Sequence, residues 1–234
     1  MYSWRKASRR LDDGRLTYVP CEKCGSESFS SVLRMRPASG EARRNCTIGW
    51  VREPLGRFVS GYRELEWRFK QGLNLYGDGD MGDLAFHKEQ VGSEERVLAF
   101  LDDLLSLRWY NKSGEFVIPR ALGHRNALTH VFPFSGSLVG HRFDVVGDLA
   151  TYDADAGTME AVCEMKLPPP GPHEHPTSRD PQNLNASLAK ALQRPKVRGA
   201  LRAAFRVDFD FYERSKARPR REPLEHRYAG QLAS

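Results

Sequence analysis

The chain has 234 residues, of which 40% are hydrophobic and 28% charged, a composition typical of globular proteins and outside the disordered and fibrous classes. Thirty-six lysines and arginines stand against 30 aspartates and glutamates, and the resulting net charge of +6 favours an anionic partner. No apolar run reaches the roughly 18 residues of a membrane-spanning helix, and the N-terminus lacks the apolar stretch of a signal peptide. The chain as written is therefore expected to be soluble, with no signal or anchor.

The length predicts one domain, residues 1–234, with a sizeable buried core. Basic residues gather near both ends, and the stretches 1–15 and 214–234 are predicted to be flexible basic tails. Such runs are more typical of solvated tails than of a nucleic-acid surface, so no nucleic-acid partner is expected.

The first predicted element is a strand at 16–20 (LTYVP), followed by a loop of small and polar residues and then a helix. Backbone N–H groups of such a loop can turn toward an anion, and the helix N-terminus adds a positive partial charge. In the loop KCGSESF, residues 23–29, Lys23 can reach a phosphate oxygen and Gly25 permits close backbone approach. The hydroxyls of Ser26 and Ser28 can donate hydrogen bonds. The sequence GxxxxGK[ST] is absent, so this is not a Walker loop, and an ordinary turn remains the alternative.

Cys21 and Cys24 form a CxxC pair, a pattern that suggests a zinc or a redox site. A structural zinc site needs four ligands, and no second CxxC or HxxxH pair follows at a suitable spacing. Four cysteines are also too few for a scaffold built on disulfides. We therefore interpret Cys24 as part of the phosphate loop and expect no metal.

A second strand–turn–helix unit follows, with a strand at 46–51, a turn at 52–54 and a helix at 55–70. Arg52 lies at the carboxyl end of the strand and Ser60 lies two turns into the helix. Their spacing predicts that both contact one phosphate, for which the fork of arginine donors is well suited. The alternative is a helix stabilised by an ordinary salt bridge.

Further along the chain, helical spacing predicts helices at 94–107, 186–192 and 197–211, and a short apolar run predicts a strand at 143–146. The segments 72–82, rich in Gly and Asp, and 167–181, rich in Pro, are predicted to be loops. Strands that alternate with helices predict an α/β fold with a central parallel sheet flanked by helices.

These segments carry a family resemblance. VPCEKCGSESF resembles the 5'-phosphosulfate loop of Golgi carbohydrate sulfotransferases, especially the heparan/uronyl 2-O-sulfotransferases. WVREPLGRFVSGYRE resembles their 3'-phosphate motif, of the form RDPxxRxxSxYR. The later segments HVFPFSG, FDVVGDLATYDAD and VDFDFYE are similar to later blocks of the same enzymes.

The resemblance implies a single P-loop-like sulfotransferase domain that transfers a sulfuryl group from 3'-phosphoadenosine 5'-phosphosulfate (PAPS) to a carbohydrate hydroxyl. Arg52 and Ser60 would hold the 3'-phosphate. The family usually has Thr where this chain has Glu27, and a carboxylate beside the phosphosulfate is expected to weaken donor binding. The residues implied for the 5'-phosphosulfate are Lys23, Cys24, Gly25, Ser26, Glu27, Ser28 and Phe29.

Catalysis further needs positive charge on the leaving phosphate oxygen and a base for the acceptor hydroxyl. Lys23 is the candidate for the first role, and His130, which matches a family histidine, for the second. The other histidines considered as bases are His87, His124 and His141. The resemblance also implies the Golgi lumen and a membrane anchor in a longer form, with which the sequons at Asn45, Asn111 and Asn185 are compatible.

Two alternative functions remain open. A sulfotransferase-like protein that binds PAP (3'-phosphoadenosine 5'-phosphate) without turnover is favoured by Glu27 and by the lack of a clear base. A nucleotide kinase or a nucleic-acid-binding module is favoured only by the phosphate loop and the net positive charge.

Overall fold

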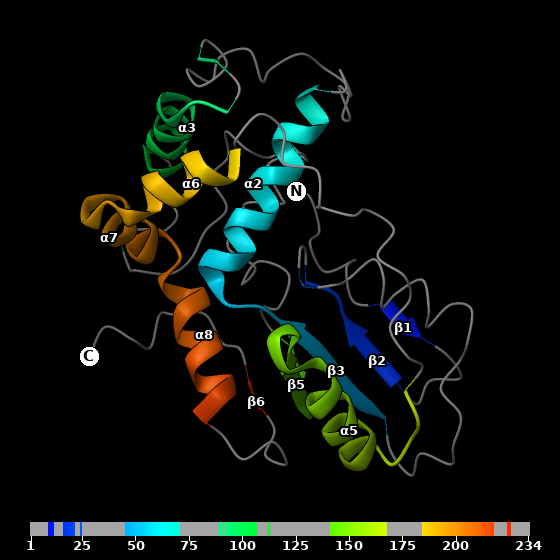
Figure 1. Ribbon diagram of the computed structural model, residues 1–234. Helices are drawn as coiled ribbons and strands as arrows, with labels where there is room; N and C mark the ends of the chain where they lie inside the picture. The colour runs from blue at the N-terminus through cyan, green and yellow to red at the C-terminus, as the bar shows by residue number, and fades with distance from the viewer. Residues whose placement is uncertain are drawn as a thin grey trace. The chain divides into compact units, whose positions relative to one another are not determined.

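The computed structural model describes residues 9–11, 16–21, 24, 45–70, 89–90, 92–106, 112, 141–167, 184–217 and 224–225 (Figure 1). The chain divides into two compact units and passes between them five times along the sequence. Unit 1 comprises Met1–Pro54, Phe134–His175 and Val207–Tyr228. Unit 2 comprises Leu55–Pro133, Pro176–Arg206 and Ala229–Ser234.

Unit 1 contains a four-stranded sheet with the order β1-β2-β3-β5. Strands β2 (Leu16–Val19), β3 (Cys46–Val51) and β5 (Val145–Asp148) run parallel, whereas β1 (Arg9–Leu11) pairs antiparallel with β2. In β3 every residue except Thr47 is buried, as expected for a strand between two parallel neighbours. Together with the helices, this sheet confirms the predicted mixed α/β class.

The helices of unit 1 follow and flank this sheet. A 3-10 turn, η5 (Leu149–Thr151), leads from β5 into α5 (Tyr152–Cys163), and α8 (Arg206–Ala217) adds Phe211 and Tyr212 to the core. Figure 1 shows α5 alongside β3 and β5, and a disulfide between Cys46 and Cys163 ties α5 to β3 across 117 residues of sequence. A separate two-stranded ribbon joins β4 (Arg142–Phe143) to β6 (Leu224–Glu225).

Unit 2 is helical in its described part. It contains α2 (Pro54–Lys70), α3 (Glu94–Ser106), α6 (Leu184–Gln193) and α7 (Pro195–Ala204). An aromatic cluster lies in its core, with ring centroids 4.7 Å apart for Tyr62 and Phe100, and 6.0 Å apart for Phe58 and Phe205. Helix α3 contacts both α6 and α7. The predicted helices at 55–70, 94–107 and 186–192 are confirmed to within two residues at each end.

The structure differs from the predicted helix at 197–211, because α7 ends at Ala204 and α8 begins at Arg206. Phe205 between them is buried, and its N–H donates to the carbonyl of Leu201. Inside the predicted basic tails, residues 9–11 form β1, residues 214–217 end α8, and residues 224–225 form β6. The predicted loop at 72–82, and all of 167–181 beyond Leu167, lie outside the described residues. One domain over residues 1–234 stays a prediction.

Gly147 in β5 and Gly157 in α5 form a matched pair for testing how tightly the core of unit 1 is packed. A Cβ atom at Gly147 would overlap the Trp50 ring and lie 2.8 Å from the Met159 methyl group, whereas one at Gly157 would meet nothing within 4 Å. We expect Gly147→Ala to lower the free energy of unfolding by about 1–3 kcal/mol through overpacking. Gly157→Ala should raise it by about 0.5–1 kcal/mol by favouring the helix. Urea unfolding of both variants measures the difference, and equal midpoints would contradict the close packing at β5.

Candidate functional site

The three parallel strands of unit 1 end at a common edge of the sheet, here called the carboxyl edge. Val51, the last residue of β3, pairs with Asp148, the last residue of β5, and Val19 at the end of β2 pairs with Gly49. Arg52 directly follows β3 at this edge. Open α/β sheets bind ligands outside the carboxyl ends of their strands, so this edge is the candidate site.

A turn that contains Cys21 and Cys24 follows β2. The backbone N–H of Cys24 donates to the carbonyl of Cys21 at 3.1 Å, and the two Sγ atoms lie 2.9 Å apart without a covalent bond. Both side chains are fully buried in the core of unit 1. The amide and the thiol of Cys24, which was assigned to the phosphate loop, thus both make contacts within the protein.

The other residues predicted to hold the 5'-phosphosulfate lie outside the described residues, as do three of the four histidines considered as bases. The fourth, His141, is half-buried, and burial lowers its pKa, which favours the neutral imidazole. Its ring centroid lies 6.2 Å from that of Phe143. The predicted site residues that the structure does not describe are Lys23, Gly25, Ser26, Glu27, Ser28, Phe29, His87, His124 and His130.

Arg52 and Ser60, predicted to hold one phosphate together, are both described and both half-buried. Arg52 lies at the carboxyl edge of unit 1, and Ser60 lies on α2, which belongs to unit 2 from Leu55 onward. Their joint contact with a phosphate therefore stays a prediction.

A buried carboxylate that the sequence did not single out closes β5 at the carboxyl edge. The Tyr212 hydroxyl donates to Asp148 Oδ2 at 2.7 Å, and Lys216 Nζ lies 3.5 Å from the same oxygen. Asp148 Oδ1 accepts from the N–H of Ala150 at 3.0 Å and caps η5. A buried charge needs such partners, since its desolvation otherwise costs several kcal/mol.

A second carboxylate supports the first from α5. Asp155 Oδ2 accepts from the N–H of Asp148 at 2.6 Å and from the Thr151 hydroxyl at 2.9 Å. Asp155 lies in the first turn of α5, where a negative charge is favoured by the helix dipole. The two carboxylates together hold the path of the chain from β5 into α5.

The electrostatics of this cluster favour the protonated forms of Tyr212 and Lys216. Burial, followed by the hydrogen bond to Asp148, raises the pKa of Tyr212, and hydrogen bonding to Tyr212 together with the charge of Asp148 raises the pKa of Lys216. Lys216 Nζ also lies 4.4 Å from the centroid of the Tyr212 ring, within cation–π range. Because each oxygen of Asp148 already accepts a hydrogen bond, the cluster is suited to positioning the edge of the sheet.

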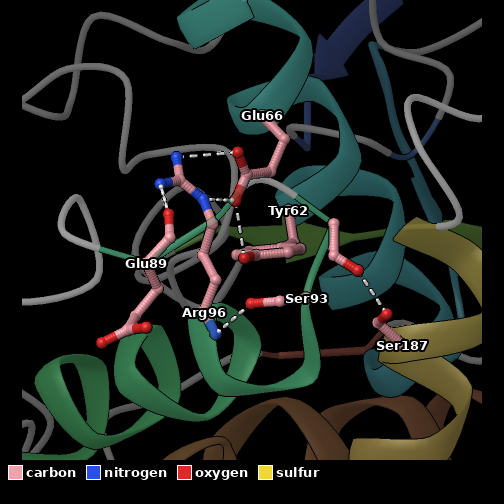
Figure 2. A network of polar contacts seen from close by, with 7 residues as sticks. Tyr62, Glu66, Glu89, Ser93, Arg96 and Ser187 are labelled. Atoms are coloured by element: carbon pink, nitrogen blue, oxygen red, sulfur yellow. Dashed lines mark hydrogen bonds and ion pairs between the residues drawn. The ribbon is translucent and has the colours of Figure 1, made fainter.

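Unit 2 contains its own buried polar network, which involves a residue of the proposed 3'-phosphate motif (Figure 2). The Tyr62 hydroxyl donates to Glu66 Oε1 at 2.7 Å, and Arg96 donates to both oxygens of Glu66, from Nε at 2.7 Å and from a terminal nitrogen at 2.9 Å. Glu66 is fully buried, and Figure 2 shows the three side chains converging between α2 and α3. Burial raises the pKa of Tyr62, so its hydroxyl stays protonated and serves as a donor.

The same arginine also stabilises the start of α3. Its guanidinium donates to the carbonyl of Glu89 at 3.0 Å, and its backbone N–H donates to the hydroxyl of Ser93 at 3.1 Å, as in an N-terminal helix cap. The Tyr62–Glu66–Arg96 network therefore joins α2 to α3, and Tyr62 takes a structural role within the motif.

The described part of the chain has neither a metal-binding cluster nor a membrane-spanning helix. It contains no group of three or more His, Cys, Asp or Glu side chains that could hold a metal ion. Nor does any helix of this part have the length and apolar character needed to cross a bilayer.

No protein-family model, curated protein or solved structure matches the chain significantly. The resemblance to carbohydrate sulfotransferases accordingly rests on the quoted motifs, and the activity that it implies stays a prediction.

Tyr212 and Tyr152 allow the Asp148 cluster to be tested with the same substitution at two buried hydroxyls. Tyr212→Phe removes a donor from a buried carboxylate and should lower the free energy of unfolding by about 1–3 kcal/mol. The buried Tyr152 hydroxyl has no hydrogen-bond partner in the described residues. The Tyr152 ring stacks on the Trp50 ring, with the two centroids 4.4 Å apart. Tyr152→Phe keeps that stacking and should be neutral or slightly stabilising. Chemical unfolding of both variants checks the contrast, which an equal loss of stability would contradict.

Proposed function

We propose that the chain is a PAPS-dependent sulfotransferase that transfers a sulfuryl group to a hydroxyl of a carbohydrate acceptor, with a P-loop-like fold. The observation that carries the proposal is the parallel pairing of β2 with β3. Because parallel neighbours end at the same edge, the chain leaving β2 toward Lys23 and the chain leaving β3 at Arg52 start from one edge of the sheet. Two phosphate-binding segments on neighbouring strands suit a donor that carries phosphate groups at both its 3' and 5' positions.

In this proposal each motif has a separate role. The segment 23–29 holds the 5'-phosphosulfate, with Lys23 placing positive charge on the oxygen that leaves with PAP, while Arg52 and Ser60 hold the 3'-phosphate. His130 takes the proton of the acceptor hydroxyl, whose oxygen attacks the sulfur as the bond from sulfur to the phosphate oxygen breaks. No metal is required for this step, since the positive charge comes from Lys23.

The disulfide between Cys46 and Cys163 supports a lumenal location for the proposed enzyme. Structural disulfides persist in oxidising compartments and are rare in the cytosol. The proposal therefore includes the Golgi lumen, where carbohydrate acceptors are sulfated in the resembling family.

The cofactor class is tested first, with Arg52 as the residue that recognises the 3'-phosphate. Wild type should bind PAP more tightly than ADP, and Arg52→Ala should weaken PAP binding by about 2–4 kcal/mol while ADP binding barely changes. The reason is that the guanidinium contact exists only when the ligand has a 3'-phosphate. Calorimetric titration of both ligands into both proteins measures the four affinities.

Arg142 provides the matched control for this titration, since it is an exposed arginine on β4 of the same unit. Arg142→Ala should leave both affinities unchanged. Equal losses for PAP and ADP in Arg52→Ala, together with lower stability, would identify Arg52 as a structural residue and remove the 3'-phosphate assignment.

Lys23 is tested by turnover. Lys23→Ala should lower the rate of sulfuryl transfer from PAPS to a glycan acceptor on the order of a hundredfold or more, because one stabilising charge is lost in the transition state. Lys166→Ala is the control, since Lys166 is exposed and its ion pair with Glu160, 2.8 Å long, lies on the surface of unit 1. Unchanged turnover in a folded Lys23→Ala protein would refute the assignment.

A further inference from the structure

The turn after β2 holds two thiols in contact. The Sγ atoms of Cys21 and Cys24 are 2.9 Å apart, and the hydrogen bond from the N–H of Cys24 to the carbonyl of Cys21 fixes the backbone between them. A disulfide requires sulfur atoms about 2.05 Å apart, so the pair needs an approach of only roughly 0.9 Å to form a bond. Few rearrangements of the surrounding core are needed for a movement of this size.

Unit 1 already contains a disulfide, and this bond indicates that the two thiols would also be exposed to an oxidant. Cys46 and Cys163 are joined between β3 and α5, and both belong to the same core cluster as Cys21 and Cys24. Forming that bond removes two electrons from the chain, so the protein that carries it has met an oxidant. The neighbouring pair, separated by two residues and held in contact, is positioned for the same chemistry.

Burial decides which oxidant can act on the pair. Both side chains have 0% of their surface exposed, so a bulky disulfide reagent has no direct access to either sulfur. A hydroperoxide is smaller than such a reagent, so a smaller local opening of the fold suffices for it to reach a sulfur. Once one cysteine has reacted, its partner is in contact and resolves it faster than any thiol from solution.

We propose that Cys21 and Cys24 are a redox-active pair that closes reversibly to an intrachain disulfide, a modification site at the carboxyl edge of unit 1 that reacts with hydroperoxides. With hydrogen peroxide, one thiol gives up its proton and the resulting thiolate attacks a peroxide oxygen. The O–O bond breaks, the leaving hydroxide takes up that proton to become water, and a sulfenic acid forms. The sulfur of the second cysteine then attacks the sulfenic sulfur, the S–O bond breaks, and a second water leaves. Two thiols have lost two electrons and two protons, and the peroxide has been reduced to two waters. A dithiol reductant reverses the reaction by exchange.

This chemistry goes beyond the proposed sulfuryl transfer and does not depend on it. The pair is distinct from the Cys46–Cys163 bond in its span, since two residues rather than a long stretch of the fold separate its members. Lys23 lies between the two cysteines in the sequence, so the cross-link would close around that residue.

Peptide mapping of the full chain tests the proposal, because trypsin cleaves after Lys23. The products Leu16–Lys23 and Cys24–Arg34 carry one cysteine each and stay joined only if the disulfide has formed. The folded protein is reduced mildly with dithiothreitol, freed of it, treated with hydrogen peroxide, alkylated and digested without reductant. We expect the two peptides to be separate and alkylated before peroxide, to become mainly joined after it, and to separate again when dithiothreitol is added back.

Two further measurements make the outcome specific. In Cys21→Ser and in Cys24→Ser the joined peptide should be absent. In at least one of these variants a sulfenic-acid probe should label the remaining cysteine after peroxide, whereas wild type should show little labelling. The peptides that carry Cys46 and Cys163 should remain joined throughout in the same digests, which reports that dithiothreitol has not reduced that bond. The proposal is overturned if the peroxide-treated wild type yields two separate, alkylated peptides, or if the sulfenic probe labels the pair strongly in wild type. The digest of wild type needs no variant, so it still tests the proposal if a variant fails to fold.

Discussion

The described part of unit 1 depends on the pairing of β3 with a parallel strand on each side. A strand between two parallel neighbours is usually covered on both faces of the sheet, and β3 is accordingly buried from Ile48 to Val51. Close packing around β3 also accounts for two glycines, since Gly147 on β5 leaves room for the Trp50 ring and Gly49 within β3 leaves room for the Phe143 ring. The parallel pairing also directs the chain, because neighbouring parallel strands must deliver the segments that follow them to one edge of the sheet.

Both units bury charged groups, and both satisfy them with donors from distant parts of the sequence. In unit 1 the carboxylate of Asp148 is met by Tyr212, 64 residues away, and in unit 2 the carboxylate of Glu66 is met by Arg96, 30 residues away. Removing one of these donors leaves a buried carboxylate with fewer partners, which lowers the stability of the fold. These contacts favour one arrangement of elements over others that would leave a buried charge without hydrogen-bond partners.

The proposed function and the proposed redox pair share the carboxyl edge of unit 1 and one residue, Cys24, but they rest on different observations. Donor recognition rests on Arg52 and on the segment around Lys23, whereas the redox chemistry rests on the contact between Cys21 and Cys24. A protein that reacts with peroxide at this pair need not bind PAP, and a protein that binds PAP need not have a reactive pair. The two hypotheses can therefore fail separately.

Local patterns in the sequence were enough to predict β2, β3, α2, α3 and α6, because their apolar residues repeat at the spacing of a strand or a helix. They also placed Arg52 directly after a strand. Helix α5 went unnoticed because one of its three buried positions, Asp155, is polar, so its buried face does not stand out as an apolar stripe. What only the tertiary structure decided are the partners of buried groups: the Cys46–Cys163 bond, the contact of Tyr212 with Asp148, and the break at Phe205. Each of these depends on which segments pack together, and periodicity within one segment carries no information about the residue that lies opposite in space.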